Sequence, residues 1–181
     1  MEFFVVAHEY GHLMAGHLDE STARAEMLGD LEVEAFSHSW QRELVADLLG
    51  IRLSIPIVMQ DFRLDPSPSF MGITLYFSLV DFIDRAVSVL ETGRVYARKL
   101  GSHPPASLRN ANIRDHLPSI FAAHDPLIFE SALKGSAQIS AIIELIWKMC
   151  FPRLLTAREA GIKPWAKWRT VPNLGRPSGA H

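Results

Sequence analysis

The sequence is poor in cysteine and has no long hydrophobic run, and each of these absences excludes a class of protein. Cys150 is the only cysteine among the 181 residues, so no intramolecular disulfide can form and we expect a reducing, cytoplasmic setting. The most apolar segment, residues 70–90, contains Asp81, Asp84 and Arg85 and is too polar for an unassisted transmembrane helix. The first residues lack the basic region of a signal peptide, so we expect none.

The net charge is also small, −2 from 18 Lys and Arg against 20 Asp and Glu, but the charges are unevenly distributed. Residues 1–60 carry 3 cationic and 10 acidic side chains, whereas residues 61–181 carry 15 and 10. A basic region can bind nucleic acid, but a solvated surface tail is the more common reason for such asymmetry. We therefore expect no nucleic-acid partner.

Strand-like alternation of polar and apolar residues is nearly absent, and hydrophobic residues recur instead at helical spacing. The composition, 48% hydrophobic and 21% charged, is typical of one globular domain. We predict a mainly α domain at residues 1–163, followed by a weakly ordered basic tail at residues 164–181 that is rich in Pro and Gly. Helices are expected over residues 2–18, 31–53, 72–100, 106–117 and 136–151. Loops or turns rich in Pro, Gly or Asp are expected at residues 65–69, 101–105 and 125–126.

The segment His8-Glu9-Tyr10-Gly11-His12 is an HExxH motif, the strongest local indication of chemistry in the sequence. Two histidines four positions apart on a helix lie about 40° from each other around its axis, so both imidazoles can bind one metal ion. The glutamate between them is placed to accept a proton from a water molecule on that ion. The alternative interpretation is a helix with two solvent-exposed histidines, and other parts of the sequence must decide between the two.

A catalytic zinc site needs a third protein ligand, and Glu43 is the best candidate. On the helix expected at residues 31–53, Glu43 and Asp47 lie on or beside the apolar stripe formed by Val33, Phe36, Trp40, Leu44, Leu48 and Ile51. A buried carboxylate without a partner is costly in free energy, and a metal ion would remove that cost. The alternative is that Arg24 or Arg85 pairs with these carboxylates.

Together these residues predict a catalytic zinc site. We expect His8, His12 and Glu43 to bind one zinc ion, leaving a fourth position for water. Glu9 would take a proton from that water as the general base. Asp47, one turn beyond Glu43, would orient a ligand histidine and fix its tautomer.

The same residues belong to a longer series of motifs that resembles a family of gluzincin zinc metallopeptidases, which includes the CAAX-prenyl proteases and heat-shock membrane proteases. The series consists of an HExGHxxxxH segment, then a glutamate closely followed by Ala-Asp, then a His-Pro pair with an arginine six residues after the histidine. The corresponding segments are residues 8–17, 43–47 and 103–109. The resemblance implies a zincin-like helical fold and the same ligands and base, and it implies that His103 and Arg109 lie near the substrate cleft.

Two neighbouring prolines after the helix expected at residues 72–100 should turn the chain back toward the zinc helices. We therefore expect His103 or Arg109 to come within reach of a substrate, whereas Trp165 and Trp168 of the tail stay away from it. Several side chains are candidates for stabilising an oxyanion, and the sequence does not choose among Tyr76, Tyr96, His103 and Arg109.

These residues predict a zinc-dependent metalloendopeptidase that hydrolyses a peptide or protein substrate with zinc-activated water. Members of the resembled family usually have a substrate-binding sheet ahead of the HExxH helix, whereas Met1 lies only seven residues before His8. We therefore expect a chain that is short at its N-terminus and has no such sheet. The alternative is a zinc-binding pseudo-peptidase, or a truncated fragment, that acts as a regulatory or interaction module. The intact Glu9 favours the enzyme, and the expected lack of a sheet favours the alternative.

Overall fold

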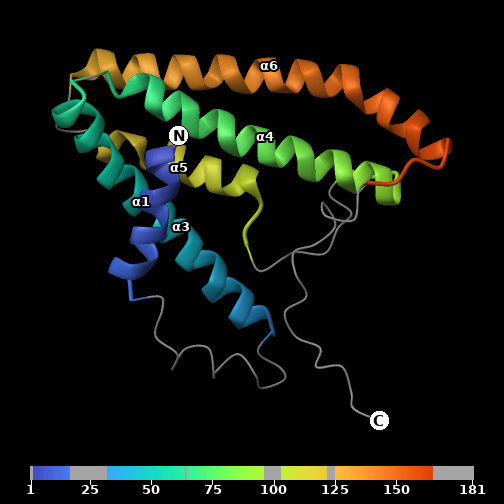
Figure 1. Cartoon of the computed structure of the whole chain (residues 1–181), viewed down its shortest axis with the longest axis horizontal. Coiled ribbons are helices and arrows are strands. Elements are labelled where there is room, and N and C mark those ends of the chain that lie inside the picture. The colour runs from blue at the N-terminus through green and yellow to red at the C-terminus, as the bar shows by residue number, and fades with distance from the viewer. Residues whose placement is uncertain (1, 17–31, 64, 96–102, 122–124, 165–181) are drawn as a thin grey trace, which may run out of the picture.

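The computed structural model describes residues 2–16, 32–63, 65–95, 103–121 and 125–164. The elements in these segments are α1 (Glu2–Met14), α3 (Glu32–Pro56), the π-helical turn η3 (Ile57–Asp61), α4 (Ser67–Thr92), α5 (Ala106–Ile120) and α6 (Pro126–Glu159). These segments contain no strand, and the prediction of a mainly α fold is confirmed. The two longest helices, α4 and α6, lie side by side along the longest axis of the molecule, and α1, α3 and α5 gather on one side of this pair (Figure 1).

The ends of α4 differ from the sequence prediction at both termini. The helix begins at Ser67, inside the expected loop, because the Asp65 carboxylate accepts a hydrogen bond from the Ser67 amide at 2.8 Å. Pro68 fits the first turn, where a missing N–H costs nothing. The helix ends at Thr92 because Gly93 adopts a left-handed conformation with φ of 77°, so the prediction that this helix extends to residue 100 is wrong.

The helix α6 is also longer than the predicted segment at residues 136–151. The turn expected at residues 125–126 starts the helix instead, because the Asp125 carboxylate accepts a hydrogen bond from the Leu127 amide at 2.9 Å. Pro126 then occupies the first helical position, where its fixed φ is favourable. The residues that indicate a turn in the sequence therefore cap this helix.

The hydrophobic core lies where the five α-helices of the described segments meet. It is a cluster of buried side chains that comprises Phe4, Ile51, Ile55, Phe70, Ile73, Phe77, Ala106, Ile113, Leu117, Phe121 and Ala132. The rings of Phe4 and Phe77 pack edge-on with centroids 5.8 Å apart, which anchors the start of α1 on α4. Because His8 lies one turn after Phe4, this contact also fixes the position of the HExxH motif.

An ion-pair network around the buried Arg85 joins α4 to α6, where its partner Glu144 is exposed. Arg85 Nε lies 2.9 Å from Asp81 Oδ2, Arg85 Nη2 lies 2.7 Å from Glu144 Oε1, and the guanidinium lies over the Trp147 ring at 4.6 Å. Arg85 is therefore not the partner of the α3 carboxylates that the sequence allowed, and Arg24 lies outside the described residues.

Among the described helices, none is long and apolar enough to cross a membrane.

Candidate metal centre

The helices α1 and α3 come unusually close because glycines lie where they meet. A Cβ atom added to Gly11 would lie 2.8 Å from the carbonyl oxygen of Ala46, and one added to Gly50 would lie 3.0 Å from the amide nitrogen of His8. Both neighbours are backbone atoms, which cannot move aside without shifting a helix. The close contact brings the HExxH face of α1 against the turn of α3 that carries Glu43.

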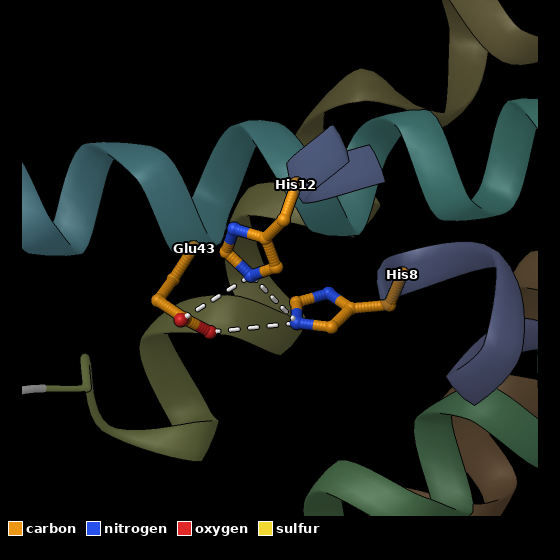
Figure 2. A group of neighbouring side chains, drawn as sticks. All are labelled: His8, His12 and Glu43. Atoms are coloured by element: carbon orange, nitrogen blue, oxygen red, sulfur yellow. Dashed lines mark hydrogen bonds and ion pairs between the residues drawn. The ribbon is translucent and has the colours of Figure 1, made fainter. Parts of the chain in front are cut away.

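Three side chains at this contact point toward one another, His8 and His12 from α1 and Glu43 from α3 (Figure 2). The Nε2 atoms of the two histidines are 3.2 Å apart, His8 Nε2 is 3.6 Å from Glu43 Oε2, and His12 Nε2 is 3.4 Å from Glu43 Oε1. Tetrahedral ligand atoms that each lie about 2.0–2.1 Å from a zinc ion are separated by roughly 3.3–3.4 Å. The donor set and its spacing therefore fit a metal ion, and the three side chains converge as the sequence predicts.

Asp47 lies one turn after Glu43 and is fully buried. Its Oδ1 atom is 3.0 Å from His8 Nδ1, the ring nitrogen that does not face the other ligands. The contact has the length of an ion pair but does not have the direction of a hydrogen bond. A proton on Nδ1 leaves the Nε2 lone pair for a metal, so Asp47 is in a position to orient His8.

Arg109 of α5 is the second partner of Asp47. Its Nε and Nη2 donate to Asp47 Oδ2 and Oδ1 at 2.8 and 2.6 Å, and its Nη1 lies 3.4 Å from Glu43 Oε2. The guanidinium also lies over the Phe77 ring, 4.9 Å from its centroid. Burial acts to lower the pKa of Arg109, but its hydrogen bond with Asp47 and the charges of Asp47 and Glu43 outweigh that effect and raise the pKa. Arg109 therefore compensates the charge of two buried carboxylates.

The ligand atoms open into a cavity of about 380 Å³. Phe4, Val5 and Glu9 line it from α1 beside the two histidines, and Tyr76, His103 and Arg109 line it from α4, the segment before α5, and α5. His103 Nε2 lies 3.5 Å from Glu43 Oε1, so the segment from residue 103 to residue 109 reaches the site as expected. Glu9 is exposed and belongs to the lining of the same cavity as the two histidines.

The protonation state of His12 near pH 7, the neutral imidazole, favours metal binding. Burial lowers the pKa of its imidazole below the ordinary value of 6.5, although the nearby Glu43 carboxylate acts in the opposite direction. The imidazole is therefore neutral near pH 7, which is the form that binds metal ions.

The structure brings all the predicted site residues together, namely His8, Glu9, His12, Glu43, Asp47, His103 and Arg109. Tyr96, Trp165 and Trp168 lie outside the described residues. Of the two tyrosines that the sequence offered as oxyanion donors, Tyr76 is the one that the structure describes, and it lines the cavity. The sequence analysis missed the structural roles of Gly11 and Gly50. The pattern that indicates this close contact is a pair of small residues four positions apart on each helix. The pairs are Ala7 with Gly11 and Ala46 with Gly50.

We compared the chain with protein-family models, with curated proteins and with solved structures, and no match was found. The functional argument therefore depends on the motif and on the geometry of the site.

Proposed function

We propose that this chain is a zinc-dependent metalloendopeptidase that hydrolyses peptide bonds in a peptide or protein substrate. The observation that carries the proposal is the group of ligand atoms from His8, His12 and Glu43, which lie 3.2 to 3.6 Å apart. Three protein ligands leave a fourth position open, as in catalytic rather than structural zinc sites. Glu9 supports the proposal further because it places a carboxylate on the wall of the same cavity.

A zinc ion held by these ligands would lower the pKa of a water molecule and polarise the substrate carbonyl. Glu9 accepts the proton of the attacking water and can pass it to the leaving amine. Asp47 and Arg109 hold His8 and Glu43 in position through the contacts described above.

Tyr76 and His103 line the cavity, and we assign to these two side chains the hydrogen bonds to the substrate carbonyl as it gains negative charge. Arg109 is less suited to this role because Asp47 engages its Nε and Nη2. The Tyr76 hydroxyl makes no hydrogen bond with any other residue that the structure describes, so it can bind a substrate at no cost to the fold.

The test separates zinc binding from catalysis. Elemental analysis of the purified 181-residue chain should give one zinc ion per chain, and His12→Ala should lose it. The zinc-loaded chain should cleave an unfolded protein such as casein, and Glu9→Gln should keep the zinc but reduce cleavage by about 10²–10⁴-fold, because the amide cannot act as a base. The matched control is Glu130→Gln, which removes an exposed carboxylate of α6 and should change neither quantity.

Each outcome distinguishes the proposal from its alternatives. A chain that binds one zinc ion but does not cleave any substrate would be the non-catalytic zinc module that the sequence also allows. Cleavage that persists unchanged in Glu9→Gln would exclude Glu9 as the base. A chain that binds no zinc at all would contradict the metal centre itself.

A further inference from the structure

The pair formed by α4 and α6 carries large apolar side chains that are exposed to solvent. Thr74 donates a hydrogen bond to Ser136, and Arg85 contacts Glu144, so the two helices lie side by side and run in the same direction (Figure 1). Six large apolar side chains along this stretch are between 41% and 61% exposed. They are Leu79 and Ile83 of α4 and Ile142, Leu145, Ile146 and Met149 of α6. We call these six side chains the apolar face.

The apolar face lies on the side of the helix pair that points away from α5. Asp81 of α4 and Glu144 of α6 line the cavity that these helices form with α5, so both residues mark the α5 side. At about 100° per residue, Leu79 lies roughly 160° from Asp81 around α4, and Ile142 lies roughly 160° from Glu144 around α6. Because the helices are parallel neighbours, their exposed stripes form one surface.

The charges next to the α6 part of the apolar face are positive. Lys134 precedes Leu145 by eleven positions, and Arg153 follows Ile142 by eleven positions. Eleven residues are about three turns, so each cation lies within roughly 20° of its apolar partner on the same side of α6. Both side chains are exposed. The stripe therefore has a cation before it and another after it.

The acidic residues of the same stretches, residues 72–90 and 134–153, lie on other sides of the two helices. Asp81 and Glu144 contact Arg85 on the α5 side. Asp84 lies roughly 140° from Leu79 around α4. In these two described stretches, the apolar face therefore contains no carboxylate that would repel a negatively charged partner.

The sequence that follows α6 has the same type of charge. Residues 160–181 contain four Lys or Arg and no Asp or Glu, and the segment Trp165-Ala166-Lys167-Trp168-Arg169 combines tryptophan with cations. This combination is typical of segments that bind where the headgroups of a lipid bilayer meet its acyl chains. The composition of this end of the chain therefore favours a lipid surface over an acidic protein as the partner.

We propose that the apolar face binds the surface of an anionic lipid bilayer. The α4/α6 pair lies in the plane of the membrane, with the six apolar side chains among the acyl chains and Lys134 and Arg153 at the level of the lipid phosphates. A second copy of the chain fits this surface less well. A two-fold axis through the centre of the α6 stripe would bring Lys134 of each copy to Arg153 of the other, and like charges oppose such a contact.

The test measures co-sedimentation of the 181-residue chain with lipid vesicles. One set contains phosphatidylcholine alone, and the other also contains about 30% phosphatidylglycerol, which is anionic. Binding to the anionic vesicles should be at least about tenfold stronger than binding to the neutral vesicles. It should weaken when the salt concentration is raised from about 0.1 to about 0.5 M, because salt screens the attraction between the cations and the lipid.

Variants locate the contact on the molecule. The double variant Leu145→Gln/Met149→Gln should weaken binding to anionic vesicles at least about tenfold, because it removes apolar surface that would enter the bilayer. Arg153→Gln should weaken it about fivefold. The matched control is Leu13→Gln/Met14→Gln, which changes the same residue types at similarly exposed positions of α1 and should bind as the unmodified chain does. Circular dichroism and thermal unfolding check that each variant is folded.

Four results would overturn the proposal. The first two are no binding to anionic vesicles at about 1 mM lipid and equal binding to neutral and anionic vesicles. The third is unchanged binding by Leu145→Gln/Met149→Gln, and the fourth is loss of binding in the α1 control, which would move the contact to α1. If the chain binds no vesicles but forms a dimer that Leu145→Gln/Met149→Gln abolishes, the apolar face belongs to a second copy instead.

The apolar face shares no residue with the lining of the metal cavity. The vesicle measurements therefore do not bear on the metal centre, and loss of zinc binding would not bear on the apolar face.

Discussion

At the scale of single residues, Arg109 compensates the negative charges of Asp47 and Glu43, the two buried carboxylates of α3. Asp47 is fully buried and Glu43 is 9% exposed; Glu43 contacts both His8 and His12, and Asp47 contacts His8. An ion pair that loses one buried partner is strongly destabilised, by about 3–5 kcal/mol, because the other charge stays without compensation. The bidentate contact of Arg109 with Asp47 therefore keeps this corner of the site folded even before a metal binds.

The proposed donor role of Tyr76 gives a prediction of its own. Tyr76→Phe should lower kcat for casein cleavage by about 10²–10³-fold, the usual cost of removing one oxyanion donor, while the affinity for zinc stays the same. Tyr10→Phe is the matched control, since Tyr10 lies in the HExxH helix but is 59% exposed and does not line the cavity. Equal turnover of Tyr76→Phe and the unmodified chain would assign the donor to His103 instead.

Residues within one helix were predictable from the sequence, and contacts between distant helices were not. His8, Glu9 and His12 follow from local spacing, and Glu43 follows from its place beside an apolar stripe. The pair formed by Asp47 and Arg109 joins residues 62 positions apart, and no periodicity within either helix reports on such a contact. For the position of Arg109 near the site, the sequence offered only a family resemblance and a pair of prolines.

At the scale of elements, hydrophobic periodicity predicted where helices occur but not where they end. The starts of α4 and α6 lie at Asp65-Pro66 and Asp125-Pro126, and both pairs read as turns in the sequence. Asp followed by Pro is equally suited to begin a helix, because the carboxylate caps the first amides and proline has no amide to satisfy. Only the surrounding packing decides between the two outcomes.

Because α1 and α3 are in close contact at Gly11, a methyl group added there should lower both the stability of the chain and its affinity for zinc. Gly11→Ala should destabilise the chain by about 1–3 kcal/mol and weaken zinc binding, because the new Cβ would force α1 away from the Ala46 carbonyl and from Glu43. Gly72→Ala in α4 is the matched control, since nothing lies within 4 Å of its new Cβ, and it should raise stability by about 0.4–1 kcal/mol. Urea unfolding and zinc titration measure both quantities. Similar stabilities of the two variants would mean that the helices adjust without cost.

At the scale of the whole molecule, the helices are not equally attached. The long helices α4 and α6 pack along most of their length, and α5 joins α3 and α4 (Figure 1). In the described part of the chain, α1 packs chiefly on α3, and the contact of Phe4 with Phe77 is its link to α4. The interface with α3 therefore contributes most to holding two of the three proposed metal ligands, His8 and His12, in place.

This arrangement has a consequence for local unfolding, because a bound ion would add a link between α1 and α3, the helix on which α1 chiefly packs. Only the docked form of α1 can bind zinc through all three ligands, so zinc at about 100 times its dissociation constant should stabilise that form by about 2.7 kcal/mol. Hydrogen exchange measured by mass spectrometry should then be about 100-fold slower in α1 when zinc is added, with little change in α6. The same measurement on His12→Ala should show no effect of zinc in either helix. Equal slowing of α1 and α6 in the unmodified chain would mean instead that the helices open as one cooperative unit.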